Sequence, residues 1–147
     1  MFAKSFVAGW GDMDFNSHMK NTAYLDKAAD ARMLFFAEHR FPMSEFSRLR
    51  IGPVVMKDEV EYFREIHLLE EFNVDLAVAG LAEDGSRFSL RNEFFRSDGK
   101  TAARVTSIGG WLSLADRKLA AAPPPLLKAI RSLQRTGDFV PFPTSIK

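Results

Sequence analysis

Two Asp-Gly pairs, Asp84-Gly85 and Asp98-Gly99, divide the middle of the chain into segments in which apolar and polar side chains alternate. Alternation with a period of two is typical of antiparallel strands that bury one face. Asp-Gly between two such segments is a strong hairpin signal, because the tight turns of hairpins need positive φ angles. The pattern therefore predicts a meander of three strands over residues 70–82, 86–96 and 100–114.

The rest of the chain adds two strands and two helices to this expectation. Residues 53–66 and 4–10 are predicted to be further strands, which makes a sheet of about five. Residues 22–40 should form one long helix that Pro42 ends, and its apolar residues cover more than one face, so we expect it to be buried on several sides. Residues 124–135 should form an amphipathic helix. This order predicts an α+β fold in which the antiparallel sheet wraps around one central helix.

Composition and charge exclude several classes of protein. The 147 residues suffice for a single domain spanning residues 1–147. The lack of cysteine excludes disulfides, thiol catalysis and cysteine-based metal sites. With 20 Lys and Arg against 19 Asp and Glu, the net charge of +1 gives no basic surface for nucleic acid. No apolar run is long enough for a membrane helix and no signal peptide is recognisable, so we expect a cytoplasmic protein.

Residues 11–21 (GDMDFNSHMKN) concentrate the side chains that can carry chemistry, with Asp12, Asp14 and His18 among two asparagines directly before the long helix. The first N–H groups of a helix have no partner inside it, and the helix dipole adds partial positive charge. A helix start can therefore polarise a carbonyl oxygen. A carboxylate beside it can act as a base or a nucleophile on the carbonyl carbon. The histidines are too scattered for an evident metal site.

The sequence GDMDFNSHMKNTAYL closely resembles the Asp-x-Asp-x-x-Gly-His-x-x-Asn-x-x-Tyr region of hotdog-fold thioesterases of the 4-hydroxybenzoyl-CoA type. It is also similar to the Asp-x-Asn-x-His stretch of acyl-ACP thioesterases, and the likeness in element order covers roughly residues 4–116. The resemblance implies a hotdog fold whose protomers pair edge to edge, as a homodimer or a dimer of dimers, with active sites at the interface. It implies an acyl thioester of coenzyme A or acyl carrier protein as substrate, without a metal or redox cofactor and without nucleic acid or membrane partners.

The resemblance also implies roles for individual residues. The family's catalytic aspartate falls on Asp14, Asn21 falls where the central helix begins, and Tyr24 matches the family tyrosine one turn further on. The glycine that usually precedes the histidine is Ser17 here, a departure that affects the local backbone. The expected site consists of the catalytic residues Asp14, His18, Asn21 and Asn16 and the substrate-binding residues Tyr24, Phe15 and Met19.

Each expected catalytic residue also has a structural interpretation. Asp14 and Asn16 could satisfy the backbone of a turn, a role that suits Asp12 better than Asp14. His18 could bond to nearby backbone, and Asn21 could be a helix cap, which does not exclude a second role in a site.

Two other functions remain open beside thioester hydrolysis. A hotdog enoyl-CoA hydratase would resemble Asp-x-Asn-Pro-x-His, but this chain lacks the proline and the spacing from Asp14 to His18 is one residue shorter. A hotdog domain could also bind an acyl thioester without hydrolysing it, although the set of acid, amide and histidine weighs weakly against that.

Overall fold

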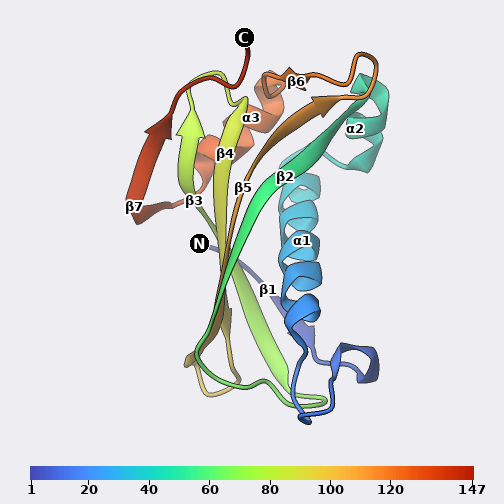
Figure 1. Cartoon of the computed structure of the whole chain (residues 1–147), viewed down its shortest axis with the longest axis vertical. Helices are drawn as coiled ribbons and strands as arrows, with labels where there is room; N and C mark the ends of the chain where they lie inside the picture. The colour runs from blue at the N-terminus through green and yellow to red at the C-terminus, as the bar shows by residue number, and fades with distance from the viewer.

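A computed structural model describes all of residues 1–147. The chain forms one curved sheet with a long helix lying along it (Figure 1). The elements, in chain order, are β1 (Phe2–Val7), the 3-10 turn η1 (Trp10–Asp12), α1 (Asn21–Glu38), α2 (Met43–Leu49), β2 (Ile51–Tyr62), β3 (Glu71–Ala82), β4 (Arg87–Phe95), β5 (Thr101–Ser113), β6 (Leu119–Ala120), α3 (Pro124–Ser132) and β7 (Arg135–Phe142).

Five strands make up the body of the sheet, in the order β1-β3-β4-β5-β2, and each neighbouring pair is antiparallel. The predicted meander of β3, β4 and β5 is confirmed, and its turns contain Gly85 and Gly99 with φ angles of 72° and 82°. β6 pairs with β5, and β7 runs parallel to β3 beyond the end of β1. The other edge of the sheet is β2, which pairs only with β5.

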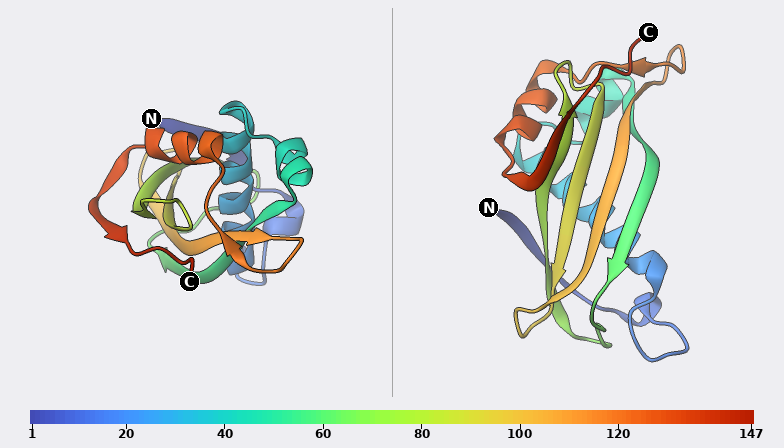
Figure 2. Two further views of the ribbon diagram at one scale, coloured as in Figure 1. Left: turned by 90° about the horizontal axis from the view of Figure 1, so that it is seen from above. Right: turned by 60° about the vertical axis from the view of Figure 1, so that its left-hand side comes forward.

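Helix α1 packs against β1, β3 and β5, and Figure 2 shows the strands curving around it. Ala28 and Ala31 are completely buried, so small side chains let the helix approach the sheet closely. This arrangement confirms the expected α+β hotdog fold. The expectation that α1 is buried on several sides is wrong for the single chain, because no element covers its other face and Ala29, Leu34 and Ala37 are exposed.

The two ends of α1 lie in different parts of the core. An aromatic cluster surrounds its C-terminal end, where Phe36, Phe46 and Trp111 meet and where α2 and α3 close the sheet (Figure 1). An alanine-rich cluster surrounds its N-terminal end and includes Ala23 and Tyr24. No helix in the structure has both the length and the apolar composition that a membrane span requires.

Sequence patterns did not predict α2, β6 or β7. The seven residues of α2 bury only Phe46, too few for a helical period to be visible. β7 contains Gly137 and Pro141, which are unfavourable in strands, and it forms because β3 extends past β1 and offers it a free edge. The predicted helix over 124–135 ends at Ser132, and the predicted strand over 53–66 ends at Tyr62.

Candidate active site

The loop that leads into α1 is held by its own hydrogen bonds. The Gly9 N–H donates to Asp12 Oδ2 (2.8 Å), and the Lys20 N–H donates to the Asp12 carbonyl oxygen (2.8 Å). The Met19 N–H donates to the carbonyl oxygen of Ile66 (2.8 Å), which ties the loop to the segment after β2. Asp12 thus has the turn role that its position suggests, and its Oδ2 also lies 3.6 Å from Lys27 Nζ.

The tip of this loop is a tight turn closed by a bridge between Met13 and Met19. The Asp14 N–H donates to the carbonyl oxygen of His18 (3.1 Å). Ser17 has a φ of 63°, a left-handed conformation that glycine adopts without strain and other residues adopt at a cost on the order of 1 kcal/mol. Ser17 therefore adopts the conformation that suits the family's glycine, but its backbone is strained there.

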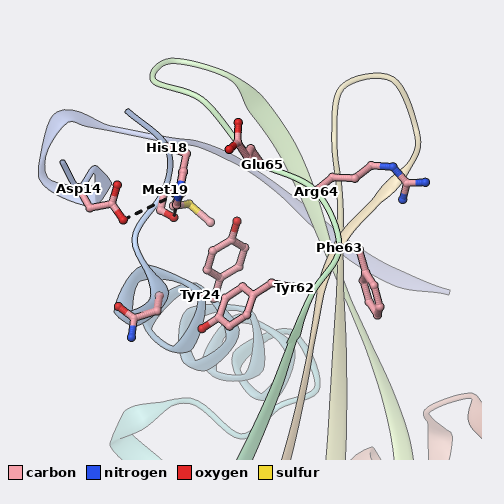
Figure 3. Close-up of a pocket in the computed structure, with 9 residues that line it drawn as sticks. Asp14, His18, Met19, Tyr24, Tyr62, Phe63, Arg64 and Glu65 are labelled. Carbon is pink, nitrogen blue, oxygen red and sulfur yellow. Dashed lines mark hydrogen bonds and ion pairs between the residues drawn. The ribbon is translucent and has the colours of Figure 1, made fainter. Parts of the chain in front are cut away.

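Asp14 and His18 face each other across the turn, with Asp14 Oδ2 3.8 Å from His18 Nδ1 (Figure 3). His18 Nδ1 lies 3.0 Å from the carbonyl oxygen of Met19, which can only accept a hydrogen bond. The proton of the neutral ring is therefore on Nδ1, and Nε2 is left as an acceptor. Asp14 Oδ1 accepts the N–H of Asn16 (2.8 Å), which orients the carboxylate. Both side chains remain partly exposed to solvent.

The start of α1 offers unpaired N–H groups beside this pair. The Ala23 N–H donates to the carbonyl oxygen of Lys20 (3.1 Å). The N–H groups of Asn21 and Thr22, by contrast, have no acceptor within the chain. No side chain caps the helix, so the interpretation of Asn21 as a side-chain cap is wrong. Free donors at a helix start attract an anionic or polarised oxygen.

Tyr24 lies one turn into α1 with only 3% of its surface exposed. Its ring packs edge to face on Tyr62 (5.3 Å between centroids) and on Phe94 (5.1 Å). Burial, reinforced by Tyr62 and by the charges of nearby carboxylates, raises the pKa of Tyr24 to about 12. Its hydroxyl makes no hydrogen bond within the chain, so it is a neutral donor that faces the site.

These groups line one hollow of about 380 Å³, which we call the polar hollow. Five of the seven expected site residues lie there, and its lining consists of Asp14, His18, Met19, Asn21, Tyr24, Tyr62, Phe63, Arg64 and Glu65. The other two lie outside it. Asn16 is exposed and contributes its backbone N–H to Asp14, and Phe15 is fully exposed and lines an adjoining hollow together with Trp10 and Leu68.

No sequence pattern indicated that Tyr62, Phe63, Arg64 and Glu65 would form a wall of the site. These residues belong to a segment predicted only as strand, and the pairing order brings its end beside the start of α1. Figure 3 shows Tyr62 packed against Tyr24, whereas Phe63 and Arg64 extend away from Asp14. No group of three or more His, Cys, Asp or Glu side chains is placed to hold a metal ion.

Comparisons with known proteins agree with this arrangement. The sequence model of the thioesterase-like superfamily matches residues 8–130, and a search of curated protein sequences finds no match. Among solved structures, a Staphylococcus aureus protein in complex with CoA is 20% identical, with a TM-score of 0.81 over 92% of this chain and 86% of that chain. A 1,4-dihydroxy-2-naphthoyl-CoA thioesterase from Synechocystis is 18% identical, with a TM-score of 0.80 over 90% and 96%. A gentisyl-coenzyme A thioesterase is 19% identical, with a TM-score of 0.77 over 87% and 98%.

Proposed function

Because this chain belongs to the thioesterase-like superfamily, we propose that it hydrolyses an acyl thioester of coenzyme A or acyl carrier protein to a free acid and a thiol. The observation that carries the proposal is that the Asp14 carboxylate lines the same hollow as Asn21, at the helix start with its unpaired N–H groups. Two of the solved structures above are CoA thioesterases, and a third is a complex with CoA.

In this mechanism the N–H groups of Asn21 and Thr22 polarise the thioester carbonyl and stabilise the oxyanion that forms on it. Asp14 either takes a proton from the attacking water or attacks the carbonyl carbon itself to give a mixed anhydride that water then opens. In both routes the carbon–sulfur bond breaks; the departing thiolate takes its proton from the protonated Asp14 in the first route and from solvent water in the second. His18, held by its Nδ1–H bond to Met19, presents Nε2 to the water. No metal or redox cofactor takes part.

Tyr24, Met19 and Phe15 are the substrate-binding residues of this proposal. The buried Tyr24 hydroxyl donates to a polar group of the substrate, and Met19 adds apolar surface to the floor of the polar hollow. Phe15 contacts the substrate from the adjoining hollow.

We further propose that two copies associate through β2. Its outer edge has no strand partner, and Val55, Met56 and Tyr62 on it are exposed. A long open edge tends to pair with another strand. Tyr62 also lines the polar hollow, so this pairing would bring the second copy next to the site.

A thiol-release assay over a panel of acyl-CoA thioesters tests the proposed reaction. The panel contains acetyl-, hexanoyl-, palmitoyl-, 4-hydroxybenzoyl- and phenylacetyl-CoA, each measured with and without prior dialysis against a chelator. We expect release from at least one member, unchanged by the chelator. Hydration of crotonyl-CoA without thiol release would indicate a hydratase, and tight binding without release would indicate a binding domain.

A further inference from the structure

The hollow that contains Phe15 adjoins the polar hollow at Asp14, which lines both. It measures about 630 Å³, and its lining is Trp10, Gly11, Met13, Asp14, Phe15, Ser17 and Leu68. Four of these seven residues are large and apolar, so we call it the apolar hollow. The polar hollow also contains the apolar side chains of Met19 and Phe63, but Asp14, His18, Asn21, Glu65 and the hydroxyls of its two tyrosines add groups that can form hydrogen bonds.

The apolar hollow exposes side chains that a folded chain usually buries. Trp10 is 82% exposed and Phe15 is fully exposed. The segment that carries them is fixed nonetheless, because the Asp12 N–H donates to the carbonyl oxygen of Gly9 (3.0 Å), the Met13 N–H to that of Trp10 (3.3 Å) and the Asp14 N–H to that of His18 (3.1 Å). A fixed, exposed apolar surface beside a site indicates that something apolar binds there.

A thioester has two arms, and both start at the carbonyl carbon. With that carbon held at Asp14, one arm enters the polar hollow and the other enters the apolar hollow. The thiol arm is phosphopantetheine, whose amides and hydroxyl need hydrogen-bonding partners. An alkyl acyl chain gains instead from leaving water for an apolar surface. The chemistry of the two linings therefore assigns the phosphopantetheine arm to the polar hollow and the acyl chain to the apolar hollow.

Resting on the hydrolysis proposed above, we propose that the apolar hollow binds the acyl chain of the substrate and that this chain is an extended alkyl group. Phe15, Trp10 and Leu68 set the preference for chain length. A fully buried methylene strengthens binding about fourfold; because the lining side chains are themselves exposed, we take about half of that free energy for this hollow, which is a gain of about twofold per methylene. Six additional methylenes should then strengthen binding roughly 60-fold.

Binding of two thioethers of pantetheine tests this assignment without any hydrolysis. S-octyl- and S-ethyl-pantetheine carry the arm that coenzyme A and acyl carrier protein share, and neither can be cleaved. By titration calorimetry we expect the octyl compound to bind roughly 60-fold more tightly to the wild-type protein. It should also shift the fluorescence of Trp10, while Trp111 is buried in the core and should not respond.

Two variants locate the binding surface. Phe15→Ser removes a side chain from the lining and should reduce the preference for octyl over ethyl about tenfold. Leu69→Ser changes an exposed side chain on the neighbouring loop that does not line the hollow, and it should leave the preference unchanged. Phe15 is fully exposed, so its replacement does not threaten folding.

The outcomes separate this inference from the proposed hydrolysis. Equal affinity for the two thioethers, or a preference that Phe15→Ser leaves intact, overturns the assignment even if thioesters are hydrolysed. A preference for octyl that depends on Phe15 supports it even if no member of the acyl-CoA panel releases thiol.

Discussion

The two ends of α1 differ in how completely their aromatic side chains are covered. At the C-terminal end, Phe36 and Trp111 are buried in the aromatic cluster, and α2 and α3 cover them. At the N-terminal end, Trp10 and Phe15 are exposed to solvent, and the buried cluster beneath them combines six alanines with Tyr24, Phe72 and Phe94. The first end is closed by packing, whereas the second is left open and is shaped by hydrogen bonds. Substitutions at the closed end should therefore change stability, and those at the open end should change activity.

The two tryptophans provide the largest contrast. Trp111 is completely buried and donates its indole N–H to the carbonyl oxygen of Gly85 (2.9 Å). We expect Trp111→Ala to lower the free energy of unfolding by about 3–5 kcal/mol, because it leaves a cavity and an unpaired carbonyl. Trp10→Ala should change the free energy of unfolding by less than about 0.5 kcal/mol, because Trp10 is exposed. Urea unfolding of both variants measures the difference, and comparable losses would contradict the division between the two ends.

Two histidines near opposite ends of α1 make nearly the same local contact. His18 Nδ1 donates to the carbonyl oxygen of Met19 (3.0 Å), and His39 Nδ1 donates to that of Phe35 (2.9 Å). Only His18 adjoins Asp14, so His18→Ala should lower kcat about 100-fold, whereas His39→Ala should leave it within about threefold. Steady-state thiol release compares the two variants. Equal losses would mean that His18 has only a structural role.

The titration of Tyr24 reports how enclosed the floor of the polar hollow is. The chain has two tyrosines, so Tyr62→Phe leaves Tyr24 as the only one. Burial, the main cause of the raised pKa of Tyr24, remains in this variant, so Tyr24 should be clearly less ionised near pH 10.5 than an ordinary tyrosine, of which about three quarters is ionised at that pH. Ultraviolet absorbance of tyrosinate measures this, with the protein in urea as control.

The raised pKa of Tyr24 also sets the sign of a stability effect. The folded state holds this proton more tightly than the unfolded state, so its contribution is fully present below about pH 10 and is lost as the pH rises toward 12. Stability that does not fall between these values in the wild-type protein, relative to Tyr24→Phe, would contradict the raised pKa.

Ser17 gives the smallest expected effect, and it concerns the open end alone. Its φ of 63° is strained for serine, so Ser17→Gly should raise the free energy of unfolding by about 0.5–1 kcal/mol. Ser17→Ala keeps the strain and should give no gain. Thermal unfolding of the two variants checks this, and equal melting temperatures would show that the turn is relaxed with serine.

The parts of the fold that follow from the sequence are those with a strong local pattern. The alternating segments and their Asp-Gly turns predict β3, β4 and β5 closely, and the apolar run before Pro42 predicts α1. β7 could not be predicted, because it depends on a free edge of β3 that exists only after the sheet has formed.

The same distinction applies to the site. Asp14, His18 and Asn21 come from one continuous segment, so a local motif was sufficient to gather them. Tyr62 and Glu65 lie about forty residues further along the chain and reach the hollow only through the pairing order of the sheet. The conformation of Ser17 likewise needed the folded turn, because serine has no intrinsic preference for positive φ.

The most direct test of the account compares two neighbouring aspartates. Both accept a backbone hydrogen bond within the loop, but only Asp14 lines the polar hollow. On the best thioester of the panel, we predict that Asp14→Asn lowers kcat roughly 10²–10³-fold without changing the unfolding midpoint. Asp12→Asn, whose amide oxygen can still accept the Gly9 N–H, should stay within about threefold of wild type. Wild-type activity in Asp14→Asn would contradict the central claim that this carboxylate carries the reaction.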